Sequence, residues 1–327
     1  MENEILLSEK NINLINTIND KTNQINQKNL IGNKRKLHSS TLSQKTSSTQ
    51  KKIKYIDISN GKEKTQILLN SKDKTKLIKN FQFTTNYITE LKIFKSNSFK
   101  FHNQNEENIL DNYKLPKSYC CNCKISCDID SCNCISKHNQ IYECNSNCLC
   151  KKKNCSNRII QNGIKNSLII KYINKTKGFG LFANNDISKG DFICEYIGEI
   201  ISKEEAERKI YMNYILKKPN YILQIRECYE NNFSLNTFIN SENFGNCSRF
   251  INHSCQPNLT YEFVRIEHFI PHCAFYANKD IKKGEELTFC YSSYINNNNN
   301  TLHYENKSFS YKKCECGSSL CCGFIPN

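Results

Sequence analysis

Nine cysteines between residues 121 and 155 constrain this sequence more than any other feature. Their spacing is Cys121-x-Cys123-x3-Cys127-x4-Cys132-x-Cys134 and, after nine further residues, Cys144-x3-Cys148-x-Cys150-x4-Cys155. An odd number excludes complete disulfide pairing, and nine thiols do not divide into separate four-cysteine sites. If three thiolates each bridge two metals, nine sulfurs supply the twelve bonds that three four-coordinate zinc ions require. The spacing therefore favours one trinuclear zinc cluster over the alternative of two independent zinc-finger-like sites with a spare cysteine.

Zinc is favoured over disulfides by the rest of the chain. The 327 residues contain 20 cysteines, yet the N-terminus lacks the pattern of a signal peptide and no apolar run reaches the length of a membrane span. We expect a soluble intracellular protein, where a reducing environment disfavours structural disulfides. The block should need metal to fold, and its closed coordination makes it a scaffold. Cys120 is expected to be a neighbour of the cluster and not a ligand.

The basic charge is concentrated in the N-terminal third. Residues 1–119 contain 21 Lys and Arg against 11 Asp and Glu, which accounts for most of the net charge of +15. Residues 1–54 are polar and are predicted to be a disordered basic arm. Such an arm predicts contact with nucleic acid or a chromatin surface, with a merely solvated tail as the alternative. Two basic clusters, KRK at 34–36 and KKIK at 51–54, are typical of a weak nuclear-import signal.

Most of the remaining chain predicts short strands. Apolar runs such as YIDIS, QILL, FQFTTNYI and LKIF precede the cysteine block, and SLIIKYI, DFICEYIGEII, YILQI, FSLNTFI, LTYEFVRIE, HCAFYANKDI and ELTFCY follow it. One helix is predicted over residues 202–218, where Ser202 and Glu205 form a capping box. An Asn-rich linker precedes the C-terminal run KKCECGSSLCCGF.

The stretch RFINHSCQPN, at 249–258, raises a question that it cannot answer alone. Its histidine and cysteine suit a nucleophile with its base, two metal ligands, or a tight turn without chemistry.

The cysteine block followed by CSNRIIQNG resembles the pre-SET domain of the suppressor-of-variegation 3-9 class of SET-domain histone lysine methyltransferases. YIDISNGKEKTQI resembles, more loosely, the segment that leads into it. KGFGLFA, CEYIGEII, RFINHSCQPN and GEELTFCY resemble four motifs of the SET domain. The resemblance implies a mainly β SET fold, in which the last two motifs form a pseudoknot, with a zinc-cysteine pre-SET cluster and a zinc-binding post-SET tail. The expected segments are the arm (1–54), pre-SET with its flank (55–160, cluster 121–155), SET (161–294), linker (295–311) and post-SET (312–327).

The resemblance also assigns the site. Tyr291 and Tyr196 line a channel for the substrate lysine, and Phe289 leaves room for an already methylated amine, which favours di- or trimethylation. The S-adenosylmethionine site is assigned to Lys177, Gly178, Phe179, Gly180, Tyr221, Arg249, Phe250, Asn252 and His253, with Gly178 and Gly180 expected to adopt positive φ and let the backbone approach a ligand. Cys314, Cys316 and Cys321 supply three thiolates, and the resemblance completes this fourth zinc site with Cys255. Cys322 is expected to be a bystander.

Several positions depart from the family pattern. Phe179 replaces a usual Trp, Leu223 stands where a channel aromatic is expected, and Cys290 replaces an Asp. Gln224 and Asn236 replace acidic residues, which weakens the case for an Arg-rich histone target. The leading hypothesis is methylation of lysine 9 of histone H3 in nuclear, repressive chromatin. The alternatives are the same reaction on another histone lysine or on a non-histone protein, and a catalytically inactive zinc scaffold that binds chromatin.

Overall fold

The computed structural model describes residues 54–77, 81–89, 114–123, 127, 132, 134, 141–150, 155–228, 234–291 and 312–325. All of them belong to one unit that begins at Lys52. The predicted arm up to residue 53, the run LKIF and the Asn-rich linker lie outside the described residues.

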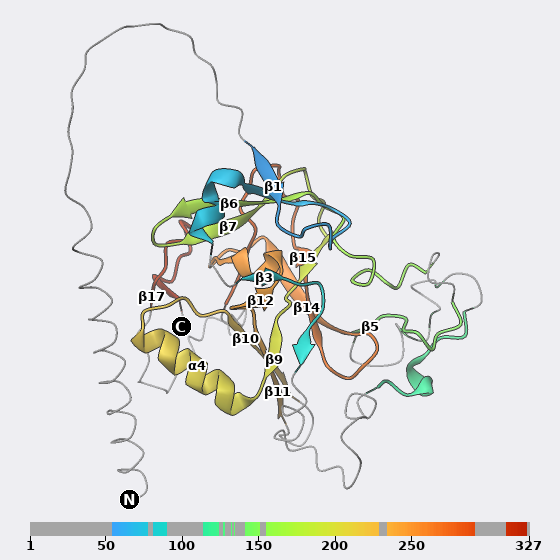
Figure 1. The fold of residues 1–327 in the computed structure, drawn as a ribbon. Coiled ribbons are helices and arrows are strands. Elements are labelled where there is room, and N and C mark those ends of the chain that lie inside the picture. Colours follow the sequence, from blue (N-terminus) through green and yellow to red (C-terminus); the bar gives the residue numbers. More distant parts are fainter. Residues whose placement is uncertain are drawn as a thin grey trace, which may run out of the picture. The chain divides into compact units, whose positions relative to one another are not determined.

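Most of the regular secondary structure in the described part of the chain is β-strand, as the short apolar runs predict (Figure 1). Three of its sheets have four strands each. The first sheet has the order β1 (Tyr55–Asp57), β2 (Ile67–Asn70), β6 (Leu168–Asn174), β7 (Gly178–Ala183). The second has the order β10 (Ile222–Cys228), β11 (Ser234–Asn240), β9 (Glu199–Ile201), β4 (Ile88–Thr89). The third has the order β5 (Ile141–Tyr142), β14 (Leu259–Arg265), β15 (His272–Ala277), β8 (Phe192–Glu195).

Three further sheets are short pairs of strands, and the first two of them connect distant parts of the chain. They are β3 (Gln82–Phe83) with β12 (Phe244–Gly245), β13 (Asn252–His253) with β16 (Thr288–Phe289), and β17 (Lys312–Lys313) with β18 (Phe324–Ile325). The 3-10 helices are η1 (Ser71–Lys76), η4 (Lys117–Tyr119) and η7 (Cys247–Phe250). The pairing of β2 with β6, β3 with β12 and β4 with β9 makes the segment before the cysteine block part of the same sheets.

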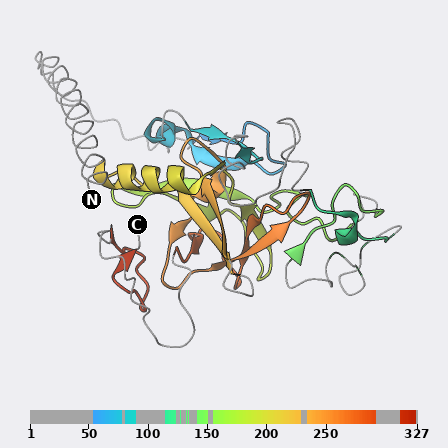
Figure 2. The same cartoon turned by 90° about the horizontal axis from the view of Figure 1, so that it is seen from below.

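The predicted helix is α4 (Lys203–Ile215), which Figure 2 shows along its length. The Ser202 side chain caps it by accepting a hydrogen bond from the Glu205 backbone N–H at 3.2 Å. The other half of the predicted capping box is wrong, because the Glu205 carboxylate pairs with Arg208 at 2.7 Å. Ala206 is fully buried and packs with Phe238 of β11, which fixes the helix on the second sheet.

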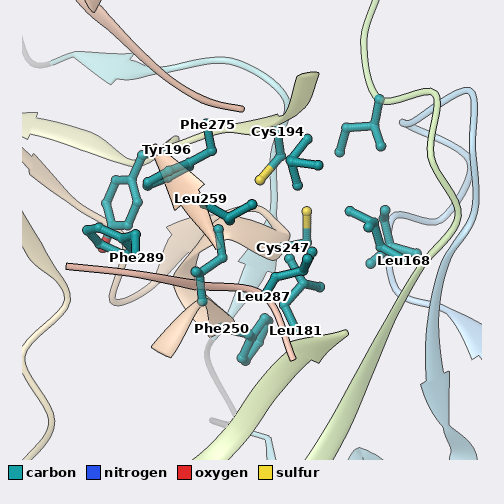
Figure 3. Close-up of a cluster of buried hydrophobic side chains, with 14 of the residues drawn as sticks. Leu168, Leu181, Cys194, Tyr196, Cys247, Phe250, Leu259, Phe275, Leu287 and Phe289 are labelled. Carbon is teal, nitrogen blue, oxygen red and sulfur yellow. The ribbon is translucent and has the colours of Figure 1, made fainter. Parts of the chain in front are cut away.

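The main core lies between the sheets and reaches the predicted site (Figure 3). Leu168 and Leu181 come from the first sheet, and Phe275 from the third. Tyr196 and Phe289 belong to the same buried cluster. Burying a side chain of this size contributes about 1.5–3 kcal/mol, so the aromatic groups of the site are held by the packing that stabilises the fold.

Candidate active site and metal centres

The two motifs predicted to form a pseudoknot lie side by side. Strands β13 and β16 pair in parallel, with Asn252 opposite Thr288 and His253 opposite Phe289. Asn258 fixes this register, because its Oδ1 accepts a hydrogen bond from the Thr288 backbone N–H at 2.9 Å. Residues from RFINHSCQPN and GEELTFCY therefore form one site.

Aromatic rings form one wall of this site. The Phe289 ring lies 4.8 Å from the rings of Phe275 and Tyr291. Phe289 and Tyr196 are both 6% exposed, whereas Tyr291 is 42% exposed. Tyr291 therefore stands at the exposed end of an otherwise buried aromatic cluster.

The hydroxyl groups of Tyr196 and Tyr291 are both oriented by the backbone. The Tyr291 hydroxyl donates to the carbonyl of Ile251 at 2.8 Å, and the Tyr196 hydroxyl donates to the carbonyl of Tyr221 at 2.9 Å. A phenol has one proton to donate, so both oxygens are left with lone pairs that accept hydrogen bonds. Burial raises the pKa of Tyr196 well above its usual value, which keeps this side chain a neutral phenol.

The glycine turn before β7 differs in one respect from the sequence expectation. Gly178 has φ +74°, as predicted, but Gly180 has no positive φ. The reason for glycine at 180 is close approach instead. A Cβ there would lie 2.9 Å from Glu286 Oε1 and 2.7 Å from the side chain of Ile173.

Glu286 is a site residue that the sequence analysis missed. Its Oε1 accepts from Asn252 Nδ2 at 2.7 Å, and its Oε2 pairs with Lys177 Nζ at 2.8 Å. Asn252 Nδ2 also donates to the Phe179 carbonyl at 3.0 Å. Both amide protons of Asn252 are thus used, which leaves its Oδ1 as the atom that can accept a further bond. The carboxylate lies within the quoted motif GEELTFCY, but nothing local in the sequence identifies its partners.

Arg249 is buried among aromatic rings. Its guanidinium carbon lies 4.1 Å from the centroid of the Tyr221 ring and 4.4 Å from that of Phe81, and Phe250 also flanks it at 5.2 Å. The residue is 5% exposed, and none of its three guanidinium nitrogens has a hydrogen-bond partner within the described ranges. Burial lowers the pKa of Arg249, and Tyr221 opposes that shift. An unpartnered buried cation of this kind fits an anionic group of a ligand.

The other residues predicted at the cofactor site lie beside these groups. The Phe179 ring packs against Tyr172 and Phe250 at 5.5 and 5.9 Å. The His253 ring is turned toward Tyr291 and Cys255: Nδ1 accepts from the Tyr291 backbone N–H at 3.1 Å, and Nε2 lies 3.4 Å from Cys255 Sγ. The sequence analysis did not predict Phe81 as a site residue. Phe81 belongs to the segment before the cysteine block, and only the folded chain brings its ring next to Arg249.

The post-SET thiols meet the predicted fourth ligand. The sulfur atoms of Cys255, Cys314, Cys316 and Cys321 all lie within 4.8 Å of one another, a separation that suits a tetrahedral zinc site. Cys322 is exposed and contributes only its backbone N–H, which lies 3.4 Å from Cys255 Sγ.

Eight of the nine predicted pre-SET thiols form three overlapping groups of four, and Cys123 belongs to none of these groups. In each group, all four sulfur atoms lie within 4.8 Å of one another. The groups are Cys121, Cys127, Cys132, Cys144; Cys121, Cys134, Cys144, Cys148; and Cys127, Cys144, Cys150, Cys155.

Three thiols lie at the centre of the cluster. Sγ atoms are separated by 3.5 Å between Cys121 and Cys127, 3.7 Å between Cys121 and Cys144, and 3.4 Å between Cys127 and Cys144. Burial and the neighbouring Cys121 raise the pKa of Cys123 to about 11, because nearby thiolates repel one another unless a cation lies between them. The donor set fits zinc. The Cys120 Sγ lies instead 3.3 Å from Asn145 Oδ1.

No helix in the described part of the chain is long and apolar enough to cross a membrane.

Comparisons with known proteins agree with this geometry. The SET domain family matches residues 178–292. The rat histone-lysine N-methyltransferase SETMAR is 38% identical over 57% of this chain and 59% of its own length. Su(var)3-9 of Drosophila pseudoobscura pseudoobscura, a histone-lysine N-methyltransferase, is 40% identical over 55% of this chain and 28% of its own length. The chain thus spans less than two thirds of these two relatives. It spans 86% of the probable histone-lysine N-methyltransferase set-23 of Caenorhabditis briggsae, at 33% identity over 63% of this chain.

Solved structures share the fold. The methyltransferase domain of human SETMAR superposes with a TM-score of 0.64 at 28% identity and covers 83% of this chain and 97% of that one. KRYPTONITE, in a complex with mCHH DNA, an H3(1-15) peptide and SAH, gives a TM-score of 0.59 at 25% identity, over 83% of this chain and 53% of that one. With the paired motifs and the cysteine clusters, these matches show that the chain belongs to the family of SET-domain histone-lysine methyltransferases.

Proposed function

We propose that this chain is an S-adenosylmethionine-dependent protein lysine methyltransferase that di- or trimethylates lysine 9 of histone H3 in nuclear chromatin. The observation that carries the proposal is the aromatic wall of Tyr196, Phe289 and Tyr291, with two oriented hydroxyl groups, beside the Asn252–His253 strand. The alternative function, a catalytically inactive zinc scaffold, does not explain this arrangement, because a scaffold does not require oriented tyrosine hydroxyl groups.

The chain's own residues would prepare the substrate amine. A lysine entering past Tyr291 would leave water and meet buried rings, which lowers the pKa of its ammonium and favours the neutral nucleophile. The lone pairs of the Tyr291 and Tyr196 oxygens would accept its N–H groups and so aim the nitrogen lone pair. Bound S-adenosylmethionine supplies an activated methyl group on a sulfonium.

The residues present fit that cofactor. We assign its carboxylate to the unpartnered guanidinium of Arg249, and one of its donor groups to Asn252 Oδ1. The backbone at Gly178 would allow close approach, and Tyr221 and Phe250 would supply flanking surface.

For zinc, we propose three ions in the pre-SET cluster and one in the post-SET site. The three central thiols, Cys121, Cys127 and Cys144, would be the bridging ligands. Six terminal ligands would then complete three tetrahedral sites, in the pairs Cys123 with Cys132, Cys134 with Cys148, and Cys150 with Cys155. The second pair is supported by the distance of 3.6 Å between Cys134 Sγ and Cys148 Sγ. Arg158 Nη2 lies 3.7 Å from Cys150 Sγ and offsets part of the cluster's negative charge.

A peptide substrate could extend the second sheet. Strand β10 pairs with β11 on one side, and among the described residues no strand pairs with its other side. Backbone groups on a free edge are a usual way to bind an extended peptide. Gln224 Nε2 donates to Asn236 Oδ1 at 2.9 Å, so the two positions that depart from the family's acidic residues form a neutral pair at this edge.

Two observations support the proposed target, lysine 9 of histone H3, and the proposed product, di- or trimethyl lysine. The Su(var)3-9 relative and the KRYPTONITE complex with an H3(1-15) peptide favour the N-terminal tail of histone H3. Phe289 packs between Phe275 and Tyr291 without a hydroxyl, which leaves space for methyl groups on the amine. Transfer of labelled methyl groups to recombinant H3, followed by mass spectrometry of the tail, tests both. Label on a different lysine would refute the target and leave methyl transfer intact.

A further inference from the structure

The His253 ring connects two parts of the site that come from different segments. One part is the pairing of β13 with β16, which leads to Tyr291. The other is the four-thiol group that contains Cys255. One ring nitrogen contacts each part, and His253 is only 6% exposed, so water competes little at either contact.

The geometry fixes where the ring carries its proton. The backbone N–H of Tyr291 is a donor and lies 3.1 Å from Nδ1, so Nδ1 acts as an unprotonated acceptor. A neutral imidazole of this form carries its proton on Nε2. Nε2 lies 3.4 Å from Cys255 Sγ, and its N–H therefore donates to the sulfur.

A donor at this sulfur matters because zinc binds a thiolate. Cys255 Sγ receives the Nε2–H of His253 and the backbone N–H of Cys322, both at 3.4 Å. Hydrogen bonds to a metal ligand orient it and adjust the metal affinity, typically by about 10- to 100-fold when one is removed.

We propose that His253 is a positioning residue that couples zinc binding at Cys255 to the placement of the catalytic Tyr291. The inference rests on the proposed function, since that function makes Tyr291 catalytic. The connection runs through the Tyr291 backbone N–H, whereas the Tyr291 hydroxyl donates to Ile251. Removing the hydroxyl alone should therefore leave the zinc side of the coupling unchanged.

The test measures zinc release from the zinc-replete full-length chain to a chromogenic chelator, for wild type, His253→Phe, His253→Gln and Tyr291→Phe. Phenylalanine keeps a ring but removes both hydrogen bonds. We expect one zinc ion per chain to leave about tenfold faster or more in His253→Phe, while the remaining ions leave at the wild-type rate and report an intact fold. Glutamine has an acceptor and a donor on neighbouring atoms, so His253→Gln should restore slow zinc release.

Tyr291→Phe separates the coupling from the proposed function. It should release zinc at the wild-type rate although it transfers no methyl groups. The coupling is refuted if His253→Phe releases all its zinc as slowly as wild type, or if Tyr291→Phe releases it as fast as His253→Phe. Full methyl transfer by Tyr291→Phe would refute the role of Tyr291 and leave the zinc result standing. Should His253→Phe not fold, His253→Asn replaces it, because the shorter side chain cannot reach both partners.

Discussion

Replacing Glu286 by alanine should weaken binding of S-adenosylmethionine without unfolding the protein. Glu286 Oε1 holds Asn252 Nδ2 at 2.7 Å, and the loss of this bond leaves the amide with one acceptor, the Phe179 carbonyl. The amide could then rotate and turn a donor toward the cofactor in place of Oδ1.

The magnitude follows from the kind of hydrogen bond. Bonds to charged groups contribute about 1.5–3 kcal/mol, and the Glu286 side chain is 21% exposed, which favours the lower limit. A loss of about 1.5 kcal/mol corresponds to roughly a tenfold higher KM for S-adenosylmethionine. Glu286→Gln keeps an acceptor for Asn252 and should stay within about threefold of wild type on the same scale.

Initial rates at saturating H3 peptide, with varied S-adenosylmethionine, measure this effect. Glu285→Ala is the matched control, because it removes the same charge from an exposed neighbour whose carboxylate accepts only from the Lys282 backbone among the described residues. An unchanged KM in Glu286→Ala, or an equal rise in Glu285→Ala, would refute the reasoning.

Four further outcomes are expected. Phe289→Tyr adds a hydroxyl beside the amine and should shift the product toward monomethyl lysine, as read by mass spectrometry of the peptide. Gln224→Glu restores a negative charge at the β10 edge and should lower KM for a basic H3 peptide by about two- to fivefold, an effect that disappears at high salt. His272 Nδ1 lies 2.5 Å from Glu195 Oε1, which raises the pKa of His272 against the opposing effect of burial. Because the pKa of His272 in the folded protein exceeds the ordinary 6.5, the pair stabilises the fold fully below pH 6.5. This stabilisation is lost as the pH rises through the pKa of His272 in the folded protein. His272→Gln should abolish that pH dependence of the melting temperature. Cys255→Ser should lose one zinc ion per chain and methyl transfer together, and retention of all zinc would contradict its assignment.

The sequence predicted those parts of the site that lie within short motifs. RFINHSCQPN and GEELTFCY have fixed internal spacing, so the pairing of Asn252 with the strand of Phe289 could be anticipated from the family. The cysteine spacing similarly indicated a thiol cluster, and eight of the nine predicted pre-SET thiols lie in its groups, whereas Cys123 does not.

Contacts between distant segments could not be predicted in this way. Phe81 meets Arg249 because β3 pairs with β12, and nothing near Phe81 in the sequence indicates that pairing. The partners of Glu286 and the direction of the His253 ring likewise depend on tertiary packing. Gly180 shows the same limit, because glycine is required there by the close approach of the Ile173 and Glu286 side chains and not by its own backbone angle.

Methyl transfer to histone H3 tests the central claim most directly. Zinc-replete full-length chain, labelled S-adenosylmethionine and recombinant H3 are compared with H3 that carries arginine at position 9 and with the Tyr291→Phe variant. We predict label on wild-type H3, with di- and trimethyl lysine 9 in the mass spectrum, and none in the two controls. Absence of label on H3 and on every other histone, from protein that retains its zinc, would contradict the account.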